Sequence, residues 1–197
     1  MDIDRLDSID AERINANAQA INAAKQLLET NFLVLDTETT GLDSDAEIIE
    51  IAILDSDGNV LFESYVNPKT PCTTAAQQIH GITPDILADA PTWPNVHERV
   101  AALLEGRTVA IYNAEFDNRL LLQTCKKYAL TAPKYNAFCV MDVYSKFDGE
   151  WNDYMNNWRW HRLTSAARDL NCYERDAHRA AADCKMALGV LRGIARG

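Results

Sequence analysis

Residues 32–42 read FLVLDTETTGL, and the rest of the chain is interpreted outward from this stretch. Its first four residues are apolar and strand-forming, which fits a strand buried on both faces, although a short buried helix has the same pattern. Asp36 and Glu38 follow two positions apart, so an extended backbone points them the same way. Gly41 then lets the backbone turn sharply. The stretch predicts a buried strand that ends in two neighbouring carboxylates.

Two carboxylates at the end of a buried strand repel each other and lose hydration, so they stay ionised only beside a positive charge. No Lys or Arg occurs between Lys25 and Lys69, and no local base can serve. An oxygen-only pair suits a hard cation such as Mg²⁺ or Mn²⁺. The alternative is a capped strand end with two solvated acids, which is the commoner situation for a lone Asp-x-Glu.

The length of 197 residues and 47% hydrophobic content predict one globular domain with a substantial core. The net charge of −10 argues against nucleic acid, but the halves differ: residues 1–100 hold 18 acids and 5 bases, and residues 101–197 hold 11 and 14. The second half therefore predicts either a local basic surface or ordinary solvated bases.

The five cysteines are widely spaced, without a Cys-x-x-Cys pair, so we expect free thiols and no zinc site. The sequence lacks a membrane-spanning apolar run and a signal-peptide core, which leads us to expect a cytoplasmic protein.

The pattern of apolar runs predicts an α/β fold with a mixed five-stranded sheet flanked by helices. Three antiparallel strands come first and parallel strands alternating with helices follow. We expect strands at 32–36, 48–55, 60–66, 108–112 and 137–141, a hairpin turn at 56–59, and helices at 73–79, 96–104, from Asp117 to about 127, 163–170 and 177–191, with 142–162 irregular.

Residues 1–30 are expected to form an acidic, helical lead-in, separate from a domain spanning 31–197. Ile14, Ile21 and Leu28 recur every seven residues, with Ala18, Ala24 and Leu27 nearby, and together they predict an apolar helical stripe. We expect this stripe to pack on the domain, with self-association as the alternative.

Further titratable residues follow predicted strands or begin predicted helices. Asp117 opens a helix, where the helix dipole favours an acid. His178 and Asp183 are five residues apart, about 140° around an ideal helix, so they do not share a helical face. Asp142 and Asp176 are expected to be helix caps. Taken singly, each of these residues has a structural interpretation.

Taken together, the motifs have a more specific meaning. They are DTETTGL at 36–42, HGIT at 80–83, YNAEFD at 112–117, and His178 followed by Asp183. The combination resembles the DEDDh branch of the ribonuclease-H-like 3′–5′ exonucleases, which includes the proofreading subunit of the bacterial replicative polymerase. The resemblance covers about residues 31–192, and a Tyr in place of His178 would have marked the sister branch.

The resemblance implies a ribonuclease-H-like sheet and two Mg²⁺ or Mn²⁺ ions. It implies that the ions are held by Asp36, Glu38, Asp117 and Asp183, that His178 is the general base beside the catalytic Glu38, and that the substrate is bound by Thr39, Gly41, Leu42, His80, Asn113 and Phe116. Tyr112 departs from the family, where His often stands, but this position is not a metal ligand there.

The segment 151–162 matches none of the family's motifs. Trp151, Trp158 and Trp160 lie among basic residues, an arrangement that can stack and neutralise a single nucleic-acid strand. The alternative, slightly favoured, is a small satellite core beneath a long loop.

The leading functional prediction is a metal-dependent 3′–5′ exonuclease that releases nucleoside monophosphates from single-stranded or frayed 3′ ends, with DNA favoured. The alternatives are an exoribonuclease for short RNA, and a nucleic-acid-binding or polymerase-associated subunit with secondary catalysis. The expected partners are a nucleic-acid 3′ end, with a homodimer or a polymerase as further options. No segment for tethering a polymerase is evident.

Overall fold

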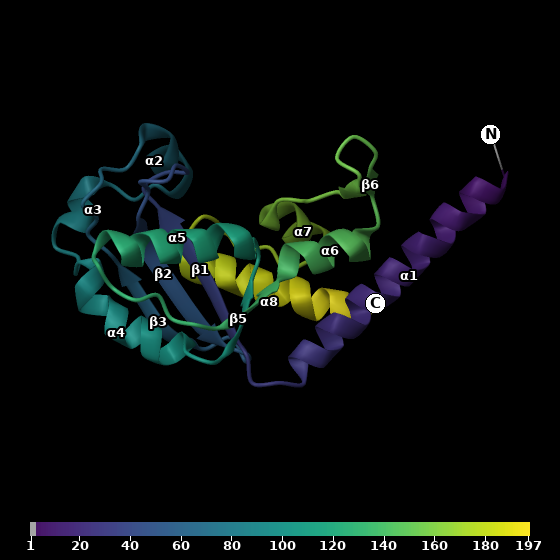
Figure 1. Ribbon diagram of the computed structural model, residues 1–197, viewed down its shortest axis with the longest axis horizontal. Coiled ribbons are helices and arrows are strands. Elements are labelled where there is room, and N and C mark those ends of the chain that lie inside the picture. Colours follow the sequence, from purple (N-terminus) through teal and green to yellow (C-terminus); the bar gives the residue numbers. More distant parts are fainter. Residues whose placement is uncertain (1–2) are drawn as a thin grey trace.

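The computed structural model of the chain describes residues 3–197, with side chains from residue 11 onward, and is built on a mixed five-stranded sheet (Figure 1). The strand order β3-β2-β1-β4-β5 confirms the predicted fold class: β1 pairs antiparallel with β2 and β2 with β3, whereas β4 runs parallel to β1 and β5 to β4. The strands are β1 (Leu33–Thr39), β2 (Ile48–Asp55), β3 (Val60–Tyr65), β4 (Thr108–Ile111) and β5 (Asn136–Cys139).

Alternating side chains of the strands pack into two separate cores. Leu33 and Leu35 belong to the core formed with α4 (Trp93–Leu104) and α5 (Ala114–Lys127). Phe32 and Val34 belong to the opposite core, formed with α8 (Ala180–Arg196). This alternation is the expected consequence of side chains pointing to opposite faces of a strand. The sheet therefore lies between α4 and α5 on one side and α8 on the other.

Three more helices pack on the α8 side, namely α1 (Ile3–Leu28), α6 (Val140–Asp148) and α7 (Leu163–Asp169). The first turns of α1 extend beyond the rest of the molecule (Figure 1). Its buried stripe is made chiefly of Ala16, Ala20, Ala24 and Leu27, whereas Ile14 is 71% exposed. The predicted stripe is therefore wrong at Ile14, because the small alanines allow the helix to lie close to its neighbours.

Two short helices, α2 (Thr74–His80) and α3 (Pro84–Ala88), connect β3 to α4. The predicted turn at 56–59 joins β2 to β3, and the Asp55 carboxylate accepts hydrogen bonds from the three backbone N–H groups of this turn. The first of the two short helices was predicted within one residue at each end, and the second was not predicted.

The region after β5 differs from its predicted form. The strand ends at Cys139, because α6 begins at Val140, where the prediction had the strand continue to Met141. Val140 and Tyr144 are both buried at helical spacing, which explains why this segment is helical. Cys139 is the N-cap, so the prediction of Asp142 as a cap is wrong, although Asp142 lies in the first turn.

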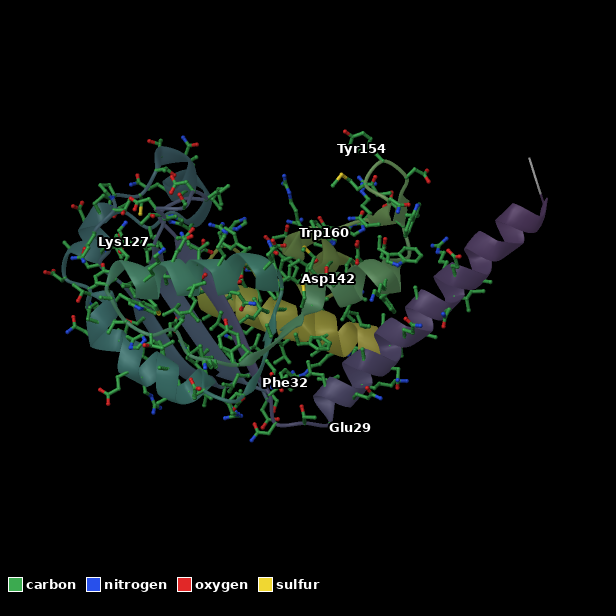
Figure 2. All side chains as sticks on the ribbon, viewed as in Figure 1. Glu29, Phe32, Lys127, Asp142, Tyr154 and Trp160 are labelled. Atoms are coloured by element: carbon green, nitrogen blue, oxygen red, sulfur yellow. The ribbon has the colours of Figure 1, made fainter. Side chains whose placement is uncertain are left out.

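The segment predicted to be irregular also contains a small hairpin of β6 (Trp151–Asn152) and β7 (Asn157–Trp158). Trp151 and Trp158 meet edge to face, with ring centroids 5.0 Å apart. Tyr154, at the tip, is 93% exposed (Figure 2). The contact between Trp151 and Trp158 is therefore the part of the predicted satellite core that is present.

Among the helices within residues 3–197, none has the length and apolar character needed to cross a membrane.

Candidate active site

Asp36 and Glu38 project from the end of β1 toward the α8 side of the sheet, since they continue the alternation of Phe32 and Val34. The strand remains extended through Thr39, as the side-by-side placement of the two acids requires. Both carboxylates are partly exposed at the surface of the site. No described residue donates a hydrogen bond to either one. The two acids are thus adjacent and lack partners from the described chain.

Asp117 reaches the same place from the first turn of α5. Because β4 runs parallel to β1, the helix that follows β4 starts beside the end of β1. The Asp117 side chain is buried and its Oδ1 accepts a hydrogen bond of 2.7 Å from the Thr37 hydroxyl. The sequence placed Asp117 at the opening of this helix, and the structure agrees.

His178 and Asp183 approach from the start of α8. The helix begins at Ala180 with Arg179 as N-cap, so the predicted start at Ala177 and the predicted cap Asp176 are wrong. His178 lies in the preceding loop with a left-handed φ of 69°, and its N–H donates to Asp183 Oδ1 at 3.0 Å. This bend overcomes the angular separation that a continuous helix would impose. Ligand atoms of Glu38, His178 and Asp183 all lie within 4.8 Å of one another.

We refer to Asp36, Glu38, Asp117 and Asp183 as the carboxylate cluster. Burial, followed by the charges of Asp117 and Asp183, raises the pKa of Asp36 well above its ordinary value. Burial and the charge of Asp183 raise the pKa of Glu38 to about 9. Burial raises the pKa of Asp117 to about 7, against the lowering effect of the Thr37 hydrogen bond. Burial also raises the pKa of Asp183, although the hydrogen bond from the His178 N–H lowers it. Burial is the largest cause of the raised pKa in all four acids.

Glu50 is a further buried acid beside the cluster, and it was missed by the sequence analysis. It pairs with Glu38 across β1 and β2, and the Arg179 guanidinium binds it through Nε at 3.1 Å and Nη2 at 2.7 Å. The Ala180 N–H also donates to Glu50 at 3.2 Å, so this side chain helps to begin α8 in place of the predicted Asp176 cap. The sequence feature that could have identified Glu50 is its position as a charged residue inside an otherwise apolar strand.

A pocket of about 240 Å³ opens on one side of the cluster, and we call it the Phe116 pocket. Five of the six predicted substrate-binding residues line it together with Glu38: Thr39, Gly41, Leu42, His80 and Phe116. The Nδ1 atom of His80 accepts from the Ile82 N–H, and the Thr39 backbone forms a further hydrogen bond with the ring. The His80 ring is therefore held at the pocket wall by backbone groups of Ile82 and Thr39.

The sixth predicted residue, Asn113, lines a different recess. This second recess, of about 420 Å³, also contains His178 and Asp183 at its inner end and Trp160 on its wall. The sequence grouped Asn113 with the other five residues, and the structure separates it from them. The carboxylate cluster consequently contributes to two recesses, through Glu38 to the Phe116 pocket and through Asp183 to the second recess.

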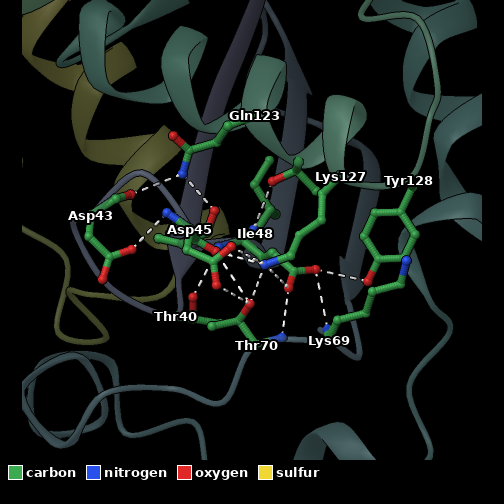
Figure 3. A network of polar contacts seen from close by, with 12 residues as sticks. Thr40, Asp43, Asp45, Ile48, Lys69, Thr70, Gln123, Lys127 and Tyr128 are labelled. Atoms are coloured by element: carbon green, nitrogen blue, oxygen red, sulfur yellow. Dashed lines mark hydrogen bonds and ion pairs between the residues drawn. The ribbon is translucent and has the colours of Figure 1, made fainter.

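The loop that leads from β1 to β2 is held by a network around the buried Glu47 (Figure 3). Glu47 accepts hydrogen bonds from the Thr70 N–H at 2.7 Å and the Tyr128 hydroxyl at 2.8 Å, and its carboxylate lies 3.1 Å from Lys127 Nζ. The Thr40 hydroxyl accepts from the Glu47 N–H. We call these residues the Glu47 network, and they fix the loop that contributes Gly41 and Leu42 to the Phe116 pocket.

The donor set of the carboxylate cluster fits divalent cations. Four acids converge there, and the nearest base, Arg179, is already bound to Glu50. Carboxylate oxygens are the preferred ligands of Mg²⁺ and Mn²⁺, whereas a zinc site would favour His and Cys. The chemistry of the site therefore matches hard, oxygen-preferring ions.

Comparison with known proteins agrees with this geometry. Residues 33–191 match the RNase_T exonuclease family. The chain is 40% identical over 188 residues to the uncharacterized exonuclease CP81 of Escherichia phage 186, covering 92% of this chain and 96% of the relative. It is 36% identical over 95 residues to the DNA polymerase III subunit epsilon of Rickettsia typhi, covering 45% of this chain and 42% of the relative.

Among solved structures, exonuclease X in complex with 5′ overhanging duplex DNA matches with a TM-score of 0.61 and 26% identity, covering 84% of this chain and 91% of that one. The family match spans most of the chain, and the phage relative matches over nearly its full length. The chain therefore belongs to the RNase_T exonuclease family and is a DEDDh-type 3′–5′ exonuclease of the ribonuclease-H-like superfamily.

Proposed function

We propose that Asp36, Glu38, Asp117 and Asp183 hold two divalent ions, Mg²⁺ or Mn²⁺, and that this site hydrolyses the terminal phosphodiester bond of a nucleic-acid 3′ end. The observation that carries the proposal is the convergence of four acids beside which the one guanidinium, that of Arg179, is already paired with Glu50. When bound, the ions would activate the attacking water and stabilise the leaving oxygen. The carboxylates of the chain position the ions and offset their charge.

His178 acts as the general base in this proposal. It lies in the loop before α8, it is exposed, and a ring nitrogen lies within 4.8 Å of carboxylate oxygens of Glu38 and Asp183. A neutral imidazole beside the reacting phosphate accepts a proton from the attacking water. The hydrogen bond from the His178 N–H to Asp183 keeps the His178 backbone next to one of the proposed metal ligands.

The Phe116 pocket receives the 3′-terminal nucleotide. Leu42 and Phe116 offer apolar surface to a base and sugar, and His80 forms part of the pocket wall. Asn113 and Thr39 complete the set of substrate-binding residues that we propose. A pocket of about 240 Å³ suits one unpaired nucleotide, so single-stranded or frayed ends are the favoured substrates. The match to a structure with 5′ overhanging duplex DNA supports DNA over RNA.

The N-terminal helix is assigned a separate role from the catalytic domain. We propose that residues 1–30 form a helical lead-in and that residues 31–197 form the exonuclease domain. The family match begins at residue 33, and Asn17 of α1 is tied to the Phe147 carbonyl of α6 by a hydrogen bond of 2.6 Å. The helix thus supports the side of the domain that carries α6 and α8.

Product analysis tests the proposal. DNA and RNA oligonucleotides labelled at the 5′ end, single-stranded and double-stranded, are incubated with Mg²⁺, Mn²⁺ or excess EDTA. We expect a ladder that shortens from the 3′ end, release of nucleoside monophosphates, faster degradation of single-stranded DNA, and no activity in EDTA. Shortening from the 5′ end, or full activity in EDTA, would contradict the proposal.

A further inference from the structure

The second recess beside the carboxylate cluster, which we call the Trp160 groove, is separate from the pocket proposed for the terminal nucleotide. It is lined by His178 and Asp183 of the proposed reaction centre and by Tyr112, Asn113, Met141, Trp160, His161, Arg162, Leu163 and Thr164. At about 420 Å³ it is larger than the Phe116 pocket. The groove therefore includes both residues of the proposed reaction centre and residues that follow the hairpin.

The two recesses share no lining residue, and each includes part of the proposed reaction centre. Glu38 lines the Phe116 pocket, whereas His178 and Asp183 line the Trp160 groove. A phosphodiester joins two nucleosides, so a phosphate placed among these residues has one nucleoside on each side. If the 3′-terminal nucleoside fills the Phe116 pocket, the preceding nucleotide is directed into the groove.

Trp160 and Arg162 are fixed in backbone position but have free side chains. Trp160 is 55% exposed and follows the β6–β7 hairpin (Figure 2). The Tyr112 hydroxyl donates to the His161 carbonyl at 3.0 Å, and the Arg162 carbonyl accepts from the Ser165 N–H at 3.0 Å. Among the described residues, none forms an ion pair or a side-chain hydrogen bond with the Arg162 guanidinium. An aromatic face and a free cation are thus presented side by side.

The other Trp and Arg residues of this region do not line the groove. Trp151 packs edge to face on Trp158, and Arg159 forms an ion pair with Glu150. Residues 151–162 contain three Trp and two Arg residues, and only Trp160 and Arg162 among them line the groove.

We propose that the Trp160 groove binds the nucleotide on the 5′ side of the scissile phosphate, with its base stacked on Trp160 and its 5′-phosphate bound by Arg162. This inference rests on the proposed function of the carboxylate cluster. Stacking on an aromatic side chain tolerates any base, because every base has a π face, and a guanidinium suits a phosphate. The groove accordingly adds affinity for a polynucleotide strand without selecting its sequence.

The test compares two substrates that differ in the upstream nucleotide. A single-stranded DNA decamer has it, whereas the p-nitrophenyl ester of thymidine 5′-monophosphate has the terminal nucleotide and a leaving group only. We expect Trp160→Ala to lower the ratio of kcat/KM for the decamer to kcat/KM for the ester by about 5- to 100-fold, through a higher KM for the decamer. Arg162→Ala should lower the ratio in the same direction, and Trp160→Phe should restore most of it.

Matched controls come from the same hairpin. Trp151→Ala and Arg159→Ala remove the same side-chain types outside the groove, so they should leave the ratio within about twofold of the wild type. An unchanged ratio in both Trp160→Ala and Arg162→Ala, or an equal fall in the two control variants, would overturn the groove proposal. Failure of the proposed function has a separate signature, namely full activity of Asp36→Asn on the nitrophenyl ester.

Discussion

Glu47 lies close along the chain to Asp36 and Glu38, but its surroundings are opposite to theirs. Glu47, just before β2, receives hydrogen bonds from Tyr128 and Thr70 and an ion pair from Lys127. Burial alone would raise the pKa of Glu47, but these hydrogen bonds outweigh burial and lower it. Asp36 and Glu38, on β1, receive no such bonds from described residues, and burial raises the pKa of both. The chain itself satisfies the Glu47 carboxylate with hydrogen bonds and an ion pair, whereas the described residues do not satisfy Asp36 and Glu38.

The difference separates an acid that holds the fold from acids that hold a ligand. A buried carboxylate that the chain satisfies itself fixes a loop, and here it fixes the loop that shapes the Phe116 pocket. A buried carboxylate left without partners destabilises the metal-free protein. Its presence in the fold indicates that a bound ligand supplies the positive charge. We therefore interpret the cluster as a site that is completed by divalent ions.

The largest expected effect comes from removing one acid of the cluster. Asp36→Asn takes away one of the four proposed metal ligands, so metal-dependent turnover should be lost altogether, together with tight Mn²⁺ binding. Turnover on a DNA decamer and calorimetric Mn²⁺ binding measure the two losses. Asp45→Asn is the control, because Asp45 is an exposed acid that forms an ion pair with Lys127 of the Glu47 network, and it should retain both properties. Retained turnover in Asp36→Asn would remove this acid from the proposed metal site.

The next largest effect concerns the base. His178→Ala should lower turnover by about 10²- to 10⁴-fold, the usual contribution of a positioned general base. Mn²⁺ binding should remain, because in our proposal His178 is not a metal ligand. A ring nitrogen of His178 lies within 4.8 Å of carboxylate oxygens of Glu38 and Asp183, which is close enough for His178 to share a metal ion with them. The Mn²⁺ measurement therefore separates a general base from a ligand. If the variant loses Mn²⁺ as completely as Asp36→Asn, His178 is a ligand.

The Glu47 network gives the contrasting, structural prediction. Glu47→Gln replaces a carboxylate oxygen with an NH₂ group that faces donors such as the Tyr128 hydroxyl. Leaving buried donors unsatisfied lowers the free energy of unfolding by about 1–3 kcal/mol. Urea unfolding in EDTA measures this loss. Mn²⁺ binding by the folded variant should match the wild type, and a simultaneous loss of Mn²⁺ would mean that the two groups of acids are not independent.

The smallest expected effect is a gain in stability, whereas the preceding substitutions cause losses. The folded chain holds protons on Glu38 and Asp117 more tightly than the unfolded chain, with pKa values of about 9 and about 7. Stability of the metal-free protein is therefore greatest below about pH 4 for these groups, and it falls as the pH rises through about 7 and about 9. Glu38→Gln removes part of this fall, so in EDTA at pH 9 its Tm should exceed that of the wild type by about 2–4 °C for each kcal/mol regained. A lower Tm for Glu38→Gln at this pH would show that Glu38 stabilises the fold.

The sequence predicted the parts of the fold that depend on local pattern. The apolar runs identified all five strands of the sheet, and the spacing of Asp36 and Glu38 predicted their shared face. Contacts between distant segments were not predictable in this way. Glu50 and Arg179 are 129 positions apart, and their pairing is what places the start of α8 after His178.

The same limit explains the errors near β5 and in α1. A buried Val140 is equally compatible with a strand and a helix, and only the packing of α6 on its neighbours decides between them. In α1 the heptad of larger residues predicted the buried stripe, but the close approach of the helix selected alanines and left Ile14 exposed. Asn113 was assigned to the substrate site by its motif, and only the structure shows that it lies in the Trp160 groove.

The central claim is that the carboxylate cluster is completed by divalent ions, and calorimetric titration of the wild-type protein with Mn²⁺ at pH 7.5 tests it most directly. The titration is run in two buffers of different ionisation enthalpy, which reports the protons released on binding. We predict two ions per chain and a net release of protons, because Glu38, with a pKa of about 9, is protonated before metal binds. Absence of Mn²⁺ binding, or binding without proton release, would contradict the account.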